Sequence, residues 1–260
     1  ISVENDNEEI VDFLIENGAN VNFSDSNGCV PLHIAAKIGS SEMISKLLQQ
    51  NANPRKKSKN GRTLFHYASF SDNPSIFQDI LTLMQTYFES SLNINTPDKF
   101  GRIPLHYACE RGNFFIVESL LKLHSDVTYC DIDGMLPIHY AAITGNSSVI
   151  ELLIKYKSPV YAKDNEERTP LHLACECGGY NAAQYLVQKY KKLINEETKY
   201  GLTPLHSLAS GEFDADNREL AKFLVEKGSD INKKNKFGQT PLQCAIENGF
   251  MNTVEVLVES

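Results

Sequence analysis

Apolar residues recur three and four positions apart in short stretches along the chain, and polar stretches containing glycine separate them. Residues 44–48 and 149–153 show this spacing clearly. It places the apolar side chains on one face of a helix. Glycines such as Gly18 and Gly228 follow two of these stretches, in the position where a helix commonly ends. The pattern therefore predicts many short amphipathic helices joined by tight turns.

A four-residue motif, most often Thr-Pro-Leu-His, recurs between these stretches. Its second residue lies at positions 31, 64, 104, 137, 170, 204 and 241, so the spacings are 33, 40, 33, 33, 34 and 37 residues. Thr followed by Pro is typical of a helix start, because the hydroxyl can accept a free backbone N–H and proline fits the first helical position. Self-similarity at this period predicts a protein of stacked repeats.

The motifs resemble ankyrin repeats, whose period and Thr-Pro-Leu-His signature are similar. The resemblance extends from about Glu9 to Leu257, and it implies an all-α solenoid of stacked helix-turn-helix units with short β-hairpin finger loops. We expect one domain over residues 1–260. Its predicted parts are a partial repeat 1–27, repeats 28–60, 61–100, 101–133, 134–166, 167–200 and 201–237, and a partial repeat 238–260.

Three places depart from the regular pattern. The spacing of 40 predicts a lengthened second helix at 75–91, which either covers its own extension or exposes Met84, Tyr87 and Phe88 to a partner. The spacing of 37 predicts a longer loop at 211–217, which is either neutral variation or a binding loop. The fifth repeat has Glu166-Glu167 where the others end their turn in glycine, so its turn should be altered or strained.

Six histidines share one repeat position: His33, His66, His106, His139, His172 and His206. Neighbouring helices lie roughly 8–10 Å apart, whereas zinc binds nitrogen at about 2 Å. The resemblance implies instead that these side chains make structural hydrogen bonds near the turns. The Cys175-Glu176-Cys177 pair has no second pair at a zinc-site distance. We therefore expect no metal and no cofactor.

The chain carries no sequence motif of a catalytic or nucleotide-binding site, so we expect that it is not an enzyme and has no small-molecule substrate. The net charge of −8 makes nucleic acid an improbable partner. No apolar stretch is long enough to span a membrane. A first residue other than Met suggests a segment of a longer chain, and six unpaired cysteines suggest the cytoplasm, with the nucleus as the alternative.

The resemblance implies a protein or peptide partner that docks on finger tips and inner helices. Matching these positions predicts contact residues at the tips, namely Lys59, Arg62, Phe100, Arg102, Ile132, Met135, Arg168, Tyr200 and Phe237. On the inner helices it predicts Ile38, Phe70, Arg111 and Ile143. The expected function is a scaffold or adaptor for protein–protein interaction.

Two other functions stay open. The segment could be a regulatory or substrate-recruiting domain of a larger enzyme. The basic run 55–62, from Arg55 to Arg62, has five cations in eight residues. Such a run is usually a solvated loop, but it can also bind an acidic peptide or act as a reader of lipid or nucleic acid.

Overall fold

The computed structural model describes residues 2–88, 92–211 and 216–260, and in these residues the chain is all-α with no strand. This confirms the predicted fold class. The finger loops are tight turns rather than paired strands. In one of them the Asp98 N–H donates to the Arg102 carbonyl at 2.9 Å and the Gly101 N–H donates to the Asp98 carbonyl at 3.1 Å. The chain separates into two compact units, residues 1–132 and 133–260.

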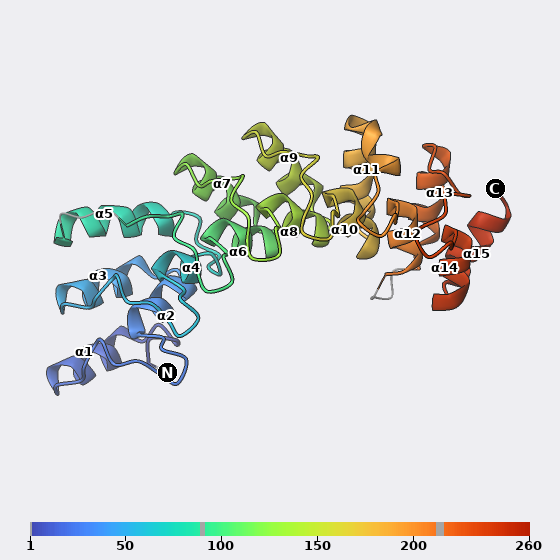
Figure 1. The fold of residues 1–260 in the computed structure, drawn as a ribbon. Coiled ribbons are helices and arrows are strands. Elements are labelled where there is room, and N and C mark those ends of the chain that lie inside the picture. Colours follow the sequence, from blue (N-terminus) through green and yellow to red (C-terminus); the bar gives the residue numbers. More distant parts are fainter. Residues whose placement is uncertain (1, 89–91, 212–215) are drawn as a thin grey trace. The chain divides into compact units, whose positions relative to one another are not determined.

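The first unit contains three helix pairs and one preceding helix (Figure 1). Its helices are α1 (Glu8–Glu16), α2 (Pro31–Ile38), α3 (Ser41–Gln49), α4 (Leu64–Ala68), α5 (Ile76–Phe88), α6 (Pro104–Glu110) and α7 (Phe114–Lys122). The inner helices, which are the first of each pair, pack in the order α2, α4, α6. The outer helices, which are the second of each pair, pack in the order α3, α5, α7.

The second unit repeats this arrangement with four helix pairs. Its helices are α8 (Pro137–Ile143), α9 (Ser147–Lys155), α10 (Pro170–Glu176), α11 (Tyr180–Lys189), the 3₁₀ helix η1 (Lys191–Asn195), α12 (Pro204–Ala209), α13 (Arg218–Glu226), α14 (Pro241–Asn248) and α15 (Met251–Val258). The inner helices α8, α10, α12 and α14 pack in sequence, and so do the outer helices α9, α11, α13 and α15. Each unit is thus two layers of helices.

The spacing of 40 residues is explained by α5, which has 13 residues where α3 and α7 each have 9. Met84 is 1% exposed, so the predicted patch of Met84, Tyr87 and Phe88 is wrong for Met84, whose side chain belongs to the core. Tyr87 stays 37% exposed, and its hydroxyl accepts a hydrogen bond from the Gln49 amide at 3.0 Å. Most of the predicted loop at 211–217 lies outside the described residues.

The histidines at this shared repeat position hold the start of six inner helices and a loop farther along the chain. In all six repeats Nδ1 accepts the backbone N–H three residues earlier, as from Thr63 to His66 at 3.0 Å and from Ile103 to His106 at 3.0 Å. In five of them a contact of Nε2 with a carbonyl farther along the chain is recorded. The carbonyl belongs to the following repeat for His66 (Arg102, 2.9 Å), His172 (Leu202, 3.0 Å) and His206 (Gln239, 3.1 Å). For His33 and His139 it belongs to the end of the same repeat, at Lys56 and Ala162. A carbonyl only accepts, so Nε2 carries the proton and the ring is neutral.

This geometry explains why Val30, Ile103 and Leu136 can stand where other repeats have Thr. The histidine supplies the acceptor, and a threonine hydroxyl is not required for it. The Thr63 hydroxyl lies 2.9 Å from the His66 Nδ1 rather than capping a helical N–H. The side chains of Val30, Ile103 and Leu136 themselves cap no helical N–H, whereas the Thr203 and Thr240 hydroxyls accept the N–H groups of His206 and Gln243 at 3.5 and 3.4 Å.

Neighbouring fingers are also joined directly through the backbone. The residue before each turn glycine accepts an N–H from the next finger, at 2.8–3.1 Å. In the first unit the pairs are Asn27–Lys59, Asn60–Lys99 and Phe100–Ile132, and in the second they are Asp133–Asn165, Glu166–Lys199 and Tyr200–Lys236. At Gly134 the approach is so close that a Cβ would lie 2.9 Å from the Asn165 nitrogen. The fingers therefore form a row of fixed register in each unit.

The fifth repeat keeps this turn despite lacking glycine. Glu167 takes a φ of +59°, the left-handed conformation that Gly134 takes at +76°. An L-residue in this conformation is strained. The predicted strain is thus present, while the predicted alteration of the turn is not: the Lys199–Glu166 backbone bond is formed at 3.0 Å.

Replacing Glu167 by glycine should relieve this strain. We expect Glu167→Gly to raise the free energy of unfolding by about 1 kcal/mol, measured by urea unfolding followed by circular dichroism. The matched control is Gly134→Ala, which adds a Cβ where space and φ both oppose it, and it should lower that free energy by about 1 kcal/mol or more. Equal effects of the two substitutions would contradict this account.

The histidine bonds should make the fold sensitive to acid. Burial lowers the pKa of His66 and of His172 to about 4 from 6.5. A depressed folded-state pKa means that the unfolded chain binds more protons, so stability is full above pH 6.5 and is lost as the pH falls toward 4. At pH 5 we expect each of the two to cost about 2 kcal/mol, seen as a lower urea midpoint than at pH 7.

The variant His66→Gln isolates this effect. Gln243 stands at the equivalent position of the last repeat, and its Oε1 accepts the Thr240 N–H at 2.9 Å. A glutamine can therefore keep the helix start but does not titrate. His66→Gln should lower stability at pH 7 and also show a smaller drop in midpoint between pH 7 and pH 5. An unchanged drop would rule out His66 as a source of the acid sensitivity.

Candidate functional site

Arginines at the base of the first unit's fingers reach toward the following finger. Arg62 Nε lies 3.7 Å from Asp98 Oδ2, and Arg102 Nε lies 3.5 Å from Asp131 Oδ2. Both aspartate side chains are fully buried, whereas the two arginines are about a quarter exposed. A buried carboxylate requires a partner charge or hydrogen bonds. These predicted contact residues therefore also hold the fingers together.

Tyr107 connects the finger to the inner helix. Its hydroxyl donates to Asp98 Oδ2 at 2.6 Å and accepts from the Arg62 guanidinium at 3.0 Å. Burial, followed by the bond to Asp98, raises the pKa of Tyr107 to about 12, so the phenol stays protonated. The Arg62 guanidinium also lies over the Tyr107 ring, 4.5 Å from its centroid.

Phe70 and Arg111, which lie just after the inner helices α4 and α6, complete this group. The Phe70 and Tyr107 ring centroids are 5.5 Å apart, and the Arg111 guanidinium lies 5.8 Å from the Phe70 centroid. Guanidinium groups at such distances are attracted to an aromatic face. Arg62, Phe70, Asp98, Arg102, Tyr107 and Arg111 form what we call the arginine–aromatic cluster. It brings together four of the predicted contact residues.

The remaining predicted residues divide by exposure. Lys59, Phe100 and Ile132 are exposed on the first unit's fingers. Ile38 and Ile143 are half-buried at the ends of α2 and α8. Met135 is only 7% exposed, so its side chain packs in the core, and its contact with a partner stays a prediction. It stands at the repeat position of Arg62 and Arg102, whose side chains turn inward from the finger, and an apolar side chain there is buried.

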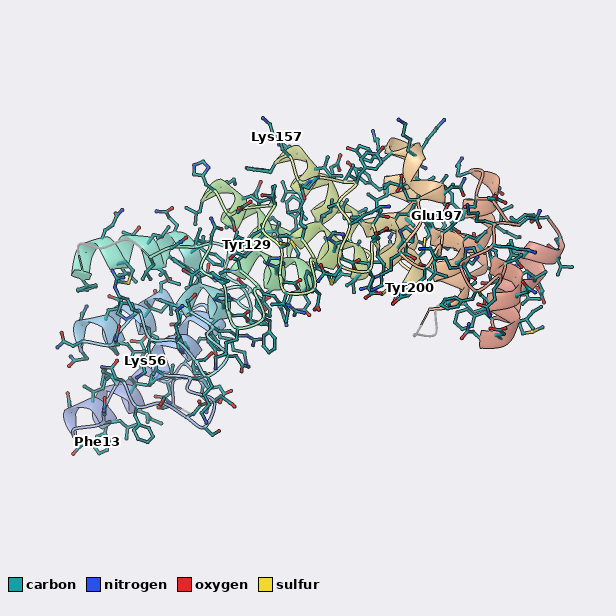
Figure 2. All side chains as sticks on the ribbon, viewed as in Figure 1. Phe13, Lys56, Tyr129, Lys157, Glu197 and Tyr200 are labelled. Atoms are coloured by element: carbon teal, nitrogen blue, oxygen red, sulfur yellow. The ribbon has the colours of Figure 1, made fainter. Side chains whose placement is uncertain are left out.

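In the second unit Arg168 is paired within its own finger and with the inner helix α10. Its Nε donates to Asp164 Oδ2 at 2.8 Å, and a terminal nitrogen donates to Glu176 at 3.3 Å. On the next two fingers, the Tyr200 and Phe237 rings stack with centroids 6.2 Å apart and planes at 25°. Tyr200 is 41% exposed and Phe237 is 70% exposed. Figure 2 labels Tyr200.

A groove lies beside this ring pair. It has a volume of about 180 Å³ and is lined by Glu166, Arg168, Glu176, Thr198, Tyr200, Leu202, Ser207 and Ser210. These residues come from two fingers and from the inner helices α10 and α12 or the residue after α12. The groove therefore offers charged groups, hydroxyls and one face of an aromatic ring side by side.

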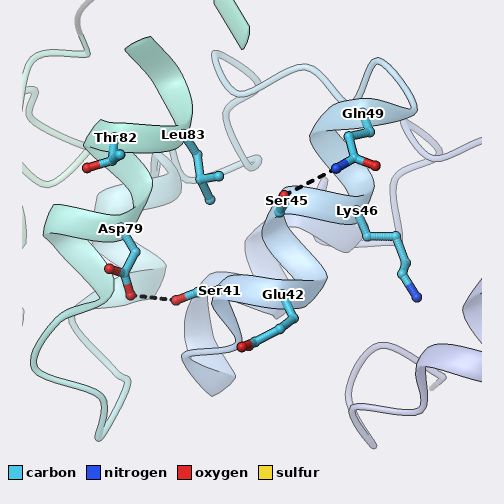
Figure 3. Close-up of a pocket in the computed structure, with 8 residues that line it drawn as sticks. All are labelled: Ser41, Glu42, Ser45, Lys46, Gln49, Asp79, Thr82 and Leu83. Atoms are coloured by element: carbon cyan, nitrogen blue, oxygen red, sulfur yellow. Dashed lines mark hydrogen bonds between the residues drawn. The ribbon is translucent and has the colours of Figure 1, made fainter. Parts of the chain in front are cut away.

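A larger hollow, of about 520 Å³, lies away from the fingers between the outer helices α3 and α5 (Figure 3). It is wide, and Ser41 donates to Asp79 across it at 2.5 Å. Figure 3 shows Lys46 extending from α3 away from α5, and this ammonium pairs with Glu8 and Asp12 of α1 at 2.9 and 2.8 Å. Besides Lys46, the charged side chains that line the hollow are Glu42 and Asp79.

The basic run occupies the stem and tip of one finger. Arg55 and Lys57 line a recess of about 260 Å³ together with Thr63, Asn93 and others. Lys56, labelled in Figure 2, and Lys59 are exposed. Arg62 differs from these four cations because it belongs to the arginine–aromatic cluster. Whether the run binds a polyanion stays a prediction.

The described residues contain no group of three or more His, Cys, Asp or Glu side chains that could hold a metal ion. None of the helices in that part of the chain has the length and apolar character needed to cross a membrane. The histidines are occupied by their two structural bonds rather than by a substrate. The sequence reasoning missed Asp98, Asp131 and Tyr107. Their signal is the Asp found three residues before the turn glycine at 98–101 and 131–134, and the Tyr after the motif histidine.

A family model described as ankyrin repeats (3 copies) matches residues 1–89, 78–164, 105–198, 156–235 and 214–260. The human transient receptor potential cation channel subfamily A member 1 is 25% identical over 263 residues, which are 98% of this chain and 19% of the channel. The "Probable 26S proteasome regulatory subunit p28" of Saccharomyces cerevisiae is 30% identical over 44% of this chain and 50% of its own length. Palmitoyltransferase AKR1 of Kluyveromyces lactis is 30% identical over 46% of this chain and 16% of its own length. The chain thus spans half or less of each of these relatives.

The carboxylate of Asp98 depends on the Tyr107 hydroxyl, and a matched pair of variants tests this. Tyr107→Phe removes a 2.6 Å bond to a buried carboxylate and should lower the free energy of unfolding by about 1–3 kcal/mol. Tyr67 stands at the same position one repeat earlier, but its hydroxyl faces the Cys29 sulfur at 2.8 Å. The Tyr67 hydroxyl also bonds to the Ser58 side chain, and both of its partners are neutral. Tyr67→Phe should therefore cost less than Tyr107→Phe in the same urea titration, about 1 kcal/mol. A larger loss at Tyr67 would contradict the assigned role of Tyr107.

Proposed function

Because this chain belongs to the ankyrin-repeat family, we propose that it binds a partner protein through its finger loops and inner helices, with Tyr200 and Phe237 as anchors. Ankyrin repeats generally mediate protein–protein interaction. The observation that carries the choice of surface is the stacked and exposed ring pair beside the groove of the second unit. Large aromatic side chains dominate the binding energy of many interfaces.

The groove supports this proposal through its chemistry. Burying the exposed ring surface of Phe237 would gain hydrophobic free energy. Next to it, Arg168, Glu176 and Ser207 offer donors and acceptors that can fix the register of a bound segment. Apolar anchors flanked by satisfied polar groups are the usual composition of a specific interface.

The rigidity of the fingers also favours binding. Tyr200 lies in a finger whose carbonyl accepts the Lys236 N–H at 2.9 Å, and His206 Nε2 contacts the Gln239 carbonyl at 3.1 Å. A surface that is already ordered loses little conformational entropy when a partner binds. The same frame gives no support to a catalytic role, because its histidines are neutral and bonded at both ring nitrogens and its groove carboxylates are ion-paired.

Recruitment of a substrate or partner to a larger enzyme is a second candidate. One relative, matched over 16% of its length, is named as a palmitoyltransferase. Recruitment would use the same binding surface, so it is a special case of the proposed function rather than a different mechanism. It would be favoured if catalytic turnover in a longer protein required Tyr200 and Phe237.

The test uses peptides selected against the folded protein from a random peptide library. We expect Tyr200→Ala/Phe237→Ala to weaken the binding of the selected peptides by tenfold or more, measured by fluorescence anisotropy. The control is Tyr161→Ala, because Tyr161 is 45% exposed and also belongs to a ring pair, with Tyr190 at 6.2 Å, but does not line the groove. Circular dichroism should show that both variants are folded. Peptides that tolerate the double variant, or that are lost with Tyr161→Ala instead, would reject this surface.

A further inference from the structure

The lysines that join neighbouring finger tips differ in what faces them: Lys199 faces a carboxylate, whereas Lys236, also in the second unit, faces Tyr200. In the second unit the Lys199 ammonium lies 2.6 Å from Glu166 Oε1, across the backbone bond that joins the two fingers. In the first unit the same bond joins Lys59 to Asn27 and Lys99 to Asn60. The residue that provides a carboxylate in the second unit is therefore a neutral asparagine at both places in the first.

Lys59 and Lys99 consequently carry charges that no carboxylate of the described residues neutralises. Both are exposed, and neither makes an ion pair among residues 2–88, 92–211 and 216–260. Arg111 is similar. Among the described residues, the contact recorded for its guanidinium is with the ring of Phe70, whose centroid is 5.8 Å away. The protein as a whole has a net charge of −8, so unneutralised cations on one finger edge are not a consequence of its composition.

The acidic groups nearest to these cations are already engaged. Asp98 and Asp131 are buried and face Arg62 and Arg102. Glu110 is 45% exposed and lies 3.7 Å from Arg102. Asp25, in the first finger, uses Oδ1 to accept the N–H groups of Asn27 and Cys29 at 2.8 Å. Three exposed cations, Lys59, Lys99 and Arg111, are left over on this surface.

Apolar side chains continue the same row of fingers. The Ile132 N–H donates to the Phe100 carbonyl at 3.1 Å, as Lys99 does to Asn60 one finger earlier. Phe100 is 42% exposed and Ile132 is 62% exposed. The finger edge of the first unit thus presents two lysines followed by two exposed apolar side chains, with Arg111 just after the inner helix α6.

We propose that this edge, defined by Lys59, Lys99, Phe100, Arg111 and Ile132, binds an acidic peptide segment of the partner. Glutamate or aspartate carboxylates pair with the three cations, and an apolar side chain of the peptide packs against Phe100 and Ile132. The proposal rests on the proposed function, since it names the chemistry of the partner. Successive fingers are spaced roughly as packed helices, 8–10 Å apart, and an extended peptide presents side chains on one face about every 7 Å, so one strand can reach consecutive fingers.

A peptide fits these observations better than a lipid surface or a nucleic acid does. The cations are interrupted by apolar side chains, which find a match in a peptide of mixed composition and none in a phosphate backbone. The large negative net charge of the protein also repels a long polyanion. Binding to vesicles or DNA is therefore the competing outcome of the experiment.

The probe is a short fluorescein-labelled peptide of alternating Glu and Leu, with the Gln-Leu peptide as its uncharged counterpart. The variant is Asn27→Glu/Asn60→Glu, which places a carboxylate opposite Lys59 and Lys99 as Glu166 stands opposite Lys199. We expect this variant to weaken Glu-Leu binding about tenfold at low salt, because exposed ion pairs contribute up to about 1 kcal/mol each. Wild-type binding should weaken with added salt.

The control is Gln78→Glu/Gln188→Glu, which changes the net charge equally at exposed positions of the outer helices α5 and α11. It should leave Glu-Leu binding unchanged. Phosphatidylserine vesicles and duplex DNA are titrated in parallel and should not bind.

Any of four results would overturn the proposal: no binding of the Glu-Leu peptide to wild type, equal binding of the Gln-Leu peptide, an equal loss in both double variants, or binding of vesicles or DNA that the Asn27→Glu/Asn60→Glu variant abolishes. None of these experiments changes Tyr200 or Phe237. If peptides selected on the whole protein still depend on those two residues, the proposed function stands and only the acidic chemistry of the partner is wrong.

Discussion

The imidazole at the fourth position of six of the seven motifs is the group on which the stack depends, because it bonds the backbone at the start of its own helix and the backbone of a loop farther along the chain. Nδ1 accepts an N–H at the start of its own helix, and Nε2 donates to a carbonyl of the next loop. Without that side chain both groups would be buried without a partner, which costs more than the bonds contribute. A neutral ring is required for both bonds. The burial that lowers the pKa of these histidines is thus part of the same arrangement.

Once the loops are held in this way, the finger register follows. The carbonyl before each turn glycine meets the N–H of the next finger, and a left-handed residue is needed to bring it there. Glu167 shows how strong this requirement is. The chain accepts a strained conformation at a non-glycine residue rather than lose the bond between Glu166 and Lys199. Backbone geometry is therefore constant along each unit, and only the side chains at the tips vary.

The fold could be predicted from the sequence because its signals are local and repeated. The period, the Pro at the helix start and the apolar spacing each depend on a few neighbouring residues. The site was predicted less well, because side-chain direction depends on the next repeat. Arg62 and Met135 occupy equivalent positions, yet one reaches the buried Asp98 and the other is itself buried. Nothing within a single motif distinguishes a tip residue that faces solvent from one that faces the following finger.

The same comparison explains how one frame can present different surfaces. A residue that holds the fingers together, such as Arg62, cannot give its charge fully to a partner, since it already neutralises Asp98. The side chains available to a partner are those at positions where the backbone alone makes the structural hydrogen bonds. The finger tips are such positions. There, a change of one side chain from Asn60 to Glu166 in equivalent positions decides whether the facing lysine is neutralised or exposed. Partner choice can therefore change along the chain without any change in the bonds that stack the repeats.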